Sequence, residues 1–316
     1  MSRPWSLSVI IPAFNEAKTI GGIVRNIRRL DEANEILVID DGSTDGTSEI
    51  AERAGATVIR HLYNIGNGAS VKTGIREATG DVLLFMDGDG QHDPADIPRL
   101  LHKMDDYDMV VGARTKESKV SAFRSLGNWG LIKVAEYLSG HSIPDLTSGF
   151  RAFHRNKILR FVHLLPNRYS YPTTSIMAFL HAGHTIHFEP LGTIRKRQAG
   201  KSHIRPFKDG FRFINIILRI IMMFAPQKIF MPASAAFLTS GGGLLSYNLF
   251  YQHNINDASI IVITVGTFTF FFGLLADQIA HIRRELGRFT LMDLAAQRTQ
   301  PANTTEDDRA QEQLLR

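Results

Sequence analysis

The chain has 316 residues, with 36 Lys and Arg against 31 Asp and Glu, 44% hydrophobic residues and no cysteine. This length allows one large domain or two smaller ones, each with its own core. The lack of cysteine excludes disulfides, thiolate nucleophiles, iron–sulfur clusters and cysteine-built zinc sites. A charged fraction of 21% beside so many apolar residues excludes a largely disordered chain.

Short β-branched runs alternate with helical patterns in the first part of the chain. The runs 7–11, 35–39, 57–60, 81–86 and 108–111 predict strands, and 17–30, 44–54, 69–78 and 95–104 predict the helices between them. Continuous apolar strands separated by helices indicate an α/β fold with a mostly parallel sheet covered on both faces. Ligands of such sheets bind beyond the carboxyl ends of the strands, so the residues that follow each strand are site candidates.

Polar and acidic residues follow four of the predicted strands, at 12–16, 40–45, 87–92 and 112–114. Asp87 and Asp89 are the strongest chemical signal among them. Because a single residue separates them on an extended chain, the two carboxylates project to the same side. That residue is Gly88, which has no side chain to obstruct the space between them. Hard oxygen ligands suit Mg²⁺ or Mn²⁺, and Gln91 adds a third oxygen. The alternative is a capping or turn role.

Residues 207–224 combine a wide apolar face with a narrow polar stripe at spacings of three and four. This pattern is typical of a helix that lies in a membrane interface, although a core helix of the domain is the alternative. The stripe consists of Lys208, Arg212, Asn215 and Arg219.

Two long stretches near the C-terminus, 229–256 and 258–276, contain no Asp, Glu, Lys or Arg, and Asp257 lies between them. As helices that rise ~1.5 Å per residue, both can cross a hydrocarbon core of roughly 30 Å. Basic residues flank the pair and are absent from its connector, so the positive-inside rule predicts a hairpin anchor with the N-terminal domain and the tail in the cytoplasm. The flanking residues are Lys208, Arg212, Arg219, Lys228, Arg283, Arg284 and Arg288. Gly241, Gly242 and Gly243 offer a weak signal for close helix packing in a homo-oligomer.

The motifs at 12–16, 40–43 and 87–91, followed by Asp-Leu-Thr-Ser-Gly-Phe-Arg at 145–151, resemble glycosyltransferase family 2. Within that family they are most similar to dolichyl-phosphate mannose synthases and related polyprenyl-phosphate glycosyltransferases with a two-helix anchor. The resemblance implies a GT-A domain over 1–206 and an interfacial helix over 207–228. A transmembrane hairpin over 229–282, with helices at about 229–251 and 258–280, and a cytoplasmic polar tail over 283–316 complete the implied organisation.

The resemblance also implies roles for residues at matching positions. A nucleotide-sugar donor would contact Pro12, Phe14, Glu16, Asp40, Asp41, Ser43 and Asp87, and the metal would be held by Asp87, Asp89 and Gln91. Phe14 stands where many relatives have tyrosine, so a hydroxyl contact is lost. The catalytic and acceptor-binding residues would be Asp89, Arg114, Ser148, Arg151, Arg197 and Lys201, the last two in a basic loop with Gly200 and Ser202.

The implied reaction moves a hexose from a nucleotide sugar to a polyprenyl phosphate with inversion. A divalent ion stabilises the charge that builds on the leaving diphosphate. The attacking phosphate oxygen is already ionised, so no general base is needed, but cations must surround the acceptor. GDP-mannose is the favoured donor, and UDP-glucose or another UDP-sugar is the alternative. A catalytically silent membrane scaffold is the alternative of another class, whereas the position of the basic residues argues against nucleic-acid binding.

Overall fold

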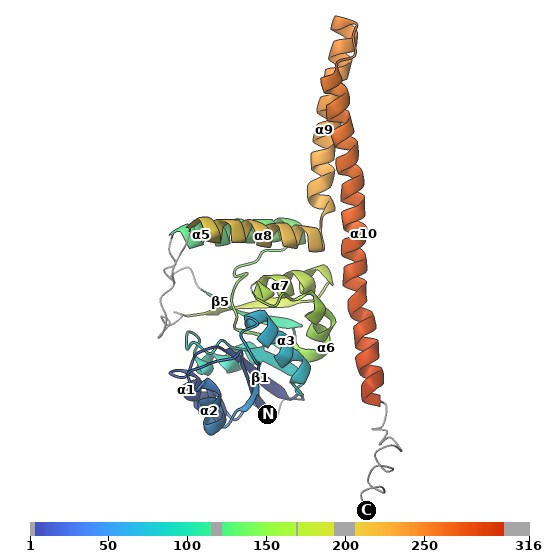
Figure 1. Ribbon diagram of the computed structural model, residues 1–316. Helices are drawn as coiled ribbons and strands as arrows, with labels where there is room; N and C mark the ends of the chain where they lie inside the picture. The colour runs from blue at the N-terminus through green and yellow to red at the C-terminus, as the bar shows by residue number, and fades with distance from the viewer. Residues whose placement is uncertain (1–3, 115–121, 169, 193–205, 300–316) are drawn as a thin grey trace, which may run out of the picture.

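The computed structural model describes residues 4–114, 122–168, 170–192 and 206–299. Its domain is built on one seven-stranded sheet, with helices on both faces (Figure 1). The spatial order of the strands is β3-β2-β1-β4-β6-β5-β7. Their bounds are β1 Leu7–Ala13, β2 Glu35–Asp40, β3 Thr57–Arg60, β4 Val82–Phe85, β5 Met109–Arg114, β6 Arg151–His154 and β7 Ile186–Leu191.

All neighbouring strands are parallel except β6, which runs antiparallel between β4 and β5. The predicted α/β fold of GT-A type is therefore confirmed, and the five predicted strands match β1 to β5. The strands β6 and β7 were not predicted. Both strands follow the predicted series of alternating strands and helices. The strand β6 has only four residues, so its place in the sheet is set by pairing with distant strands and not by a local sequence pattern.

Alternate residues of the central strands enter two hydrophobic cores, one on each face of the sheet. Ile10 of β1 belongs to one core, and its neighbours Val9 and Ile11 belong to the other. This two-residue period explains why the strands are continuously apolar. Helices α1 (Ile20–Arg28), α2 (Thr47–Ala54) and α4 (Ile97–Leu101) cover one face, and α3 (Asn67–Glu77) and α7 (Tyr171–His181) cover the other. The short α6 (Arg155–Ile158) follows β6.

Two further helices lie side by side across the top of the domain, α5 (Ala122–Ser139) and α8 (Pro206–Phe224) (Figure 1). Ile220 and Phe224 of α8 are buried against the domain, whereas Leu218 and Met222 are exposed. On α5, Trp129 and Tyr137 are also exposed. The predicted interfacial segment 207–228 overlaps α8, which begins one residue before it, at Pro206, and ends four residues earlier, at Phe224. The sequence did not indicate that α5 lies beside it.

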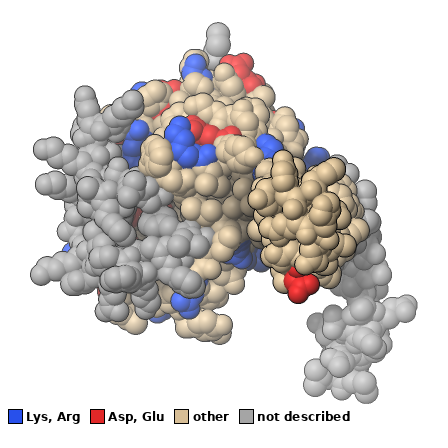
Figure 2. Space-filling view, turned by 90° about the horizontal axis from the view of Figure 1, so that it is seen from above, with Lys and Arg blue, Asp and Glu red and all other residues tan. Residues whose placement is uncertain are grey.

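The C-terminal hairpin projects from the domain roughly at right angles to α5 and α8 (Figure 1). It consists of α9 (Gln227–Tyr247), a π-helical turn (Asn248–Gln252) and α10 (Asp257–Thr299). Two stretches, Gln227–Gln252 and Asp257–Glu285, are long and apolar enough to cross a membrane. Seen end-on, the hairpin surface is nearly free of charged residues, in contrast to the domain around it (Figure 2).

Glycines let the two hairpin helices approach closely. A side chain on Gly241 would meet Ile263 of α10, and one on Gly266 would meet Leu238 of α9. Gly241 is thus used for packing within the chain, whereas Gly242 and Gly243 face open space. The glycine run therefore gives no independent support to an oligomer.

The helix α10 extends beyond the hairpin and lies along the domain. Arg284 donates to the main-chain oxygens of Met223 and Phe224 at the end of α8, at 3.3 and 3.0 Å. His163 contacts the oxygen of Arg283 at 3.0 Å. Residues 283–299, predicted as part of a polar tail, thus continue the helix, and residues 300–316 of that tail lie outside the described residues.

Candidate functional site

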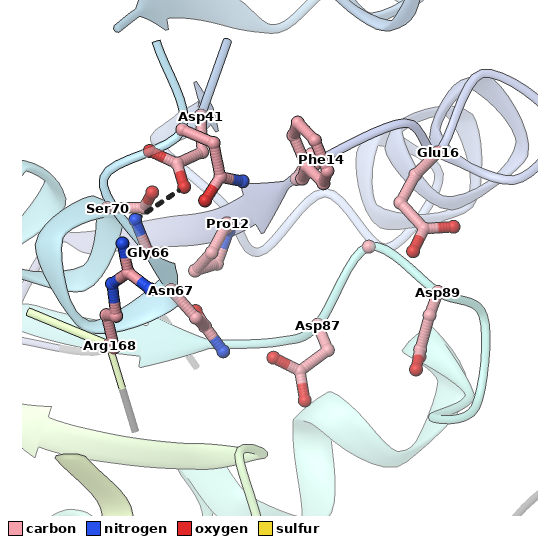
Figure 3. Close-up of a pocket in the computed structure, with 13 residues that line it drawn as sticks. Pro12, Phe14, Glu16, Asp41, Gly66, Asn67, Ser70, Asp87, Asp89 and Arg168 are labelled. Carbon is pink, nitrogen blue, oxygen red and sulfur yellow. Dashed lines mark hydrogen bonds between the residues drawn. The ribbon is translucent and has the colours of Figure 1, made fainter. Parts of the chain in front are cut away.

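A cavity of about 390 Å³ opens beyond the carboxyl ends of β1, β2 and β4, as the parallel sheet predicts (Figure 3). Four carboxylates face it, together with one basic side chain among the described residues that line it. The lining residues are Pro12, Ala13, Phe14, Glu16, Asp41, Asn64, Gly66, Asn67, Ser70, Asp87, Gly88, Asp89 and Arg168.

Asp40 and Ser43 support the cavity wall from behind. The Asp40 side chain is fully buried and accepts from the Ser43 main-chain N at 2.9 Å and from the Ser48 hydroxyl. Ser43 in turn accepts from the main-chain N of Asn15 at 2.9 Å, which fixes the turn after β1. Within the described part of the chain neither residue lines the cavity; both brace its wall, and their contact with the nucleotide stays a prediction.

The Asp41 carboxylate lies at one end of the cavity and is held by three donors. Its Oδ1 accepts from His61 Nδ1 at 2.7 Å and from the main-chain N of Ile65 at 3.0 Å. Its Oδ2 accepts from the main-chain N of Gly66 at 2.7 Å (Figure 3). His61 is oriented by Thr73, whose hydroxyl lies 3.0 Å from Nε2. Each carboxylate oxygen has two lone pairs, so Oδ1 is saturated and Oδ2 can accept one more hydrogen bond.

Asp87 and Asp89 follow β4 on a loop that is tied to the end of β1, and their side chains project to the same side (Figure 3). The main-chain N of Gly88 donates to Pro12 at 3.3 Å, and the Thr19 hydroxyl donates to the Gly88 oxygen at 2.6 Å. Asp89 Oδ1 accepts from the main-chain N of Gln91 at 3.1 Å. Gly90, with a φ of 74°, makes this tight turn possible.

The donor set fits a divalent ion that keeps open positions. Asp87 and Asp89 provide hard carboxylate oxygens at the edge of a cavity with room for further ligands. Among the described residues no group of three or more His, Cys, Asp or Glu is arranged to hold a metal alone. A two-carboxylate site therefore leaves coordination positions for substrate phosphates and water, and the role of the Gln91 side chain stays a prediction.

Arg114 is engaged by protein partners. Its Nε lies 2.8 Å from Asp145 Oδ2, and its Nη2 donates to Asp145 Oδ1 at 3.0 Å and to the Thr147 hydroxyl. Burial raises the pKa of Asp145, but the hydrogen bonds and charge of Arg114 outweigh it, and the pKa is lowered. The predicted phosphate ligand therefore ties the 145–149 turn to β5, and in the described part of the chain it does not line the cavity.

Arg151 and Ser148 flank the turn at Gly149, which lies next to the Asp87 carboxylate. The Arg151 guanidinium is fully buried and donates to Pro172 O at 2.9 Å, to Ser175 Oγ at 2.8 Å and to Ser148 O. Tyr171 donates to the next oxygen, that of Gly149, at 3.2 Å. Burial lowers the pKa of Arg151 and raises that of Tyr171. Arg151 thus supports the turn that contacts Asp87, and its role near the acceptor phosphate stays a prediction. Ser148 is also buried, and its hydroxyl has no hydrogen-bond partner.

Sequence reasoning missed the part of the lining that comes from the start of α3 and the segments beside it, which is Asn64, Gly66, Asn67, Ser70 and Arg168. Ser70 is fully buried in the first turns of α3, and its hydroxyl has no partner. Arg168 follows no strand, and its segment reaches the cavity because Gly66 and Gly68 leave room for residues 166–168 against the start of α3. In the sequence, only Gly66 and Gly68 indicated that another segment packs closely here, and the reason for these glycines is visible only once residues 166–168 are seen against the start of α3. The predicted Arg197 and Lys201 lie outside the described residues.

A protein-family model described as "Glycosyl transferase family 2" matches residues 8–160. A dolichyl-phosphate N-acetylglucosaminyltransferase of Methanococcus voltae, whose donor is UDP-N-acetylglucosamine, is 31% identical over 176 residues, which are 48% of this chain and 70% of that protein. The chain belongs to glycosyl transferase family 2. The predicted resemblance is thus confirmed.

Three further comparisons concern the C-terminal hairpin, nearly the whole chain and the fold of this family 2 protein. Residues 225–282 match "GtrB C-terminal hairpin". Glycosyltransferase AglJ of Haloferax volcanii is 28% identical over 302 residues, 90% of this chain and 97% of that protein. Glucosyl-3-phosphoglycerate synthase of Mycobacterium tuberculosis, solved with Mn²⁺, UDP-glucose and phosphoglyceric acid, shares the fold with a TM-score of 0.56 at 22% identity, covering 69% of this chain and 79% of that one.

Proposed function

We propose that this family 2 glycosyltransferase moves a sugar from a nucleotide sugar to a polyprenyl phosphate at a membrane surface, with inversion at the sugar. The observation that carries the proposal is the Asp87–Asp89 pair in a cavity whose far end holds Asp41, in a domain that continues into an apolar hairpin. The name of the Methanococcus voltae relative, a transferase to dolichyl phosphate, supports this acceptor class.

The donor is more consistent with a UDP-sugar than with the GDP-mannose that the sequence favoured. The Methanococcus voltae relative is named for UDP-N-acetylglucosamine, and the mycobacterial structure contains UDP-glucose. Neither name mentions mannose. A UDP-hexose or UDP-N-acetylhexosamine is therefore the proposed donor, and a mannosyl donor is the alternative.

The divalent ion, Mg²⁺ or Mn²⁺, would be held by Asp87 and Asp89. When bound, it supplies Lewis-acid stabilisation of the charge that develops on the leaving nucleoside diphosphate. The chain's own contribution is to hold these two carboxylates and Glu16 at one end of the cavity and Asp41 at the other. The donor is thereby stretched along the cavity with its sugar toward the acceptor side.

The acceptor needs cations but no base, because a phosphate oxygen is ionised at neutral pH. Arg114 and Arg151 are bound by protein oxygens and serve the geometry of the site. Arg197 and Lys201 remain the proposed acceptor-binding cations. The exposed Trp129 and Tyr137 on α5 and the apolar exposed residues of α8 suit a bilayer interface, where the lipid phosphate lies.

The substitution Asp89→Asn tests the metal role. We expect transfer from a UDP-sugar to polyprenyl phosphate to fall by roughly a hundredfold or more, because the loss of one anionic ligand weakens the ion that stabilises the leaving group. The exposed Asp106→Asn serves as the matched control and should retain full activity. Transfer and Mn²⁺-dependent UDP binding are measured on the full chain in nanodiscs. Unchanged, metal-independent transfer by Asp89→Asn would overturn the metal assignment, and metal-dependent UDP binding without transfer by the wild type would favour a silent scaffold.

A further inference from the structure

A second cavity, of about 360 Å³, lies where the domain meets the C-terminal hairpin. Its walls come from the 3₁₀ helix Leu159–Leu164, the end of α7, the last residue of α8 and the part of α10 that follows the hairpin (Figure 1). Among the described residues, the two cavities share no lining residue. The helix α7 runs from Tyr171, which contacts Gly149 beside the acidic site, to His181 at the second cavity. Its rise per residue sets the two cavities roughly 15 Å apart.

Three side chains at the second cavity keep hydrogen-bond donors that the protein does not use. Arg160 is exposed and, in the described part of the chain, has no hydrogen-bond or ion-pair partner. Arg284 uses Nη1 for the main-chain oxygens of Met223 and Phe224, which leaves Nη2 and Nε. The His181 ring is stacked on Phe224 with 5.2 Å between the ring centroids, and its nitrogens have no hydrogen-bond partner among the described residues either.

Positive charge prevails at this cavity. Glu285 is the one acidic side chain among the described residues that line it, and it is engaged in an interaction of its own within the protein. Part of the His181 ring is exposed, but burial of the rest, together with the charges of Arg284 and Lys228, lowers its pKa to about 4. The ring is therefore uncharged at neutral pH and keeps one N–H as a donor. Two arginines without a carboxylate partner make the cavity suited to an anion.

The remaining wall is apolar and aromatic. It is formed by Phe161, Leu164 and Phe224 together with two alanines. Such a wall favours a molecule that joins an anionic group to carbon over a free, fully hydrated ion. The oxygens of a phosphate ester accept from guanidinium groups in pairs, so two arginines at one cavity suit a phosphate ester.

The place of the cavity beside α8 indicates a lipid as the source of this phosphate. A helix with an exposed apolar face lies at the boundary between lipid headgroups and acyl chains, and Leu218 and Met222 are exposed on α8. The phosphates of neighbouring lipids then lie on the domain side of that helix. The cavity begins at Phe224, the last residue of α8, and α7, which forms another wall, lies on the domain side of α8 (Figure 1). A lipid beside the hairpin therefore has its phosphate at the depth of this cavity.

We propose that the second cavity binds the phosphate headgroup of an anionic glycerophospholipid, with Arg160, Arg284 and His181 as its donors. The aromatic wall lies against the glycerol. Bound there, the lipid joins the end of α8 to α10 and holds the domain against the bilayer beside the hairpin. The proposal goes beyond the transfer reaction and requires only that the hairpin crosses a bilayer.

Native mass spectrometry of the full chain tests this proposal. The protein is released, without donor or acceptor, from nanodiscs in which phosphatidylglycerol is titrated against phosphatidylcholine. We expect the wild type to retain phosphatidylglycerol preferentially, since only this headgroup carries a net negative charge. Arg160→Ala should weaken its apparent affinity by roughly five- to tenfold, the effect of one charge-assisted contact at a membrane surface. Arg219→Ala, which removes an exposed arginine of α8 outside the cavity, is the matched control and should retain the lipid as the wild type does.

A second variant fills the cavity without changing its charge. Ala182→Leu adds an apolar side chain at an exposed position of the lining, and it should weaken phosphatidylglycerol retention as Arg160→Ala does. Both altered side chains are exposed, so thermal unfolding of either variant should match that of the wild type. Wild-type retention in a folded Ala182→Leu protein would show that the lipid does not enter the cavity.

Equal retention of the two phospholipids by the wild type would overturn the proposal. An equal loss in Arg219→Ala and Arg160→Ala would also overturn it, because the attraction would then belong to the whole basic face. Displacement of the lipid by equimolar glycerol phosphate would assign the cavity to a soluble phosphate ester, and Arg160-dependent retention of polyprenyl phosphate alone would assign it to the acceptor. Selective phosphatidylglycerol retention by a protein that transfers no sugar would support the inference and contradict the proposed function instead.

Discussion

At the residue scale, the geometry of Asp87 depends on a glycine that touches it. A side chain on Gly149 would lie 2.5 Å from Asp87 Oδ2, although the backbone of Gly149 does not have a positive φ. Glycine is therefore required at position 149 because no space is left for a side chain, and not because of its backbone conformation. The turn cannot retreat freely, because Arg151 holds the oxygen of Ser148 and Tyr171 holds that of Gly149.

We predict that Gly149→Ala displaces the Asp87 carboxylate and weakens Mn²⁺ binding by about tenfold or more, the size of effect that groups supporting a metal ligand commonly have. Gly22→Ala, where an added methyl meets open space on α1, is the matched control. Mn²⁺ titration in the presence of UDP measures the effect, and thermal unfolding reports whether the domain is intact. An unchanged Mn²⁺ affinity in a folded Gly149→Ala protein would show that Asp87 is not held by this contact.

Individual residues also show which parts of the site can be predicted from the sequence. Asp41, Asp87 and Asp89 were predictable because each follows an apolar strand, and parallel strands end at one edge. The supporting roles of Asp40 and Arg114 were not predictable, because the sequence alone does not distinguish a charged residue that faces a ligand from one that pairs with a buried partner. Ser70 and Arg168 reach the cavity through the docking of one segment on α3, which no local pattern encodes.

At the element scale, local pattern predicted the parallel strands and the hairpin and failed where pairing is long-range. The strand β6 joins the sheet between β4 and β5 by antiparallel pairing. The helix α10 continues past the hairpin to Thr299, and Arg283 and Arg284 contact the domain. A hydropathy pattern predicts only the apolar, membrane-spanning part of such a helix and not its charged continuation. The hairpin itself, with its uncharged surface, supports a membrane span (Figure 2).

The orientation of the hairpin gives a prediction that the cysteine-free chain makes easy to test. Basic residues flank the hairpin at its domain side, so we expect the connector to face the opposite side of the membrane from the domain. In intact cells, a membrane-impermeant maleimide should label Asn254→Cys at once and Glu77→Cys only after permeabilisation. Labelling of both sites from the same side would mean that the hairpin does not cross the membrane.

At the scale of the whole molecule, the family 2 domain, two surface helices and an apolar hairpin are arranged as the proposed reaction at a bilayer requires. The helices α5 and α8 lie across the domain roughly at right angles to the hairpin, as a membrane surface lies to a span (Figure 1). The lower part of α10 fastens the hairpin to the domain through Arg284 and the end of α8. Under the proposed function, this arrangement would bring a water-soluble donor and a lipid acceptor to one cavity.

The most direct measurement of the central claim is sugar transfer by the full chain in nanodiscs that contain polyprenyl phosphate. Labelled UDP-N-acetylglucosamine, UDP-glucose and GDP-mannose are offered in parallel with Mn²⁺, and the organic extract is analysed by mass spectrometry. We predict a polyprenyl-phosphate sugar from a UDP donor, with the linkage inverted relative to the donor and with little product from GDP-mannose. Transfer from GDP-mannose alone would contradict the proposed donor, and the absence of a lipid-linked product from all three donors would contradict the proposed function.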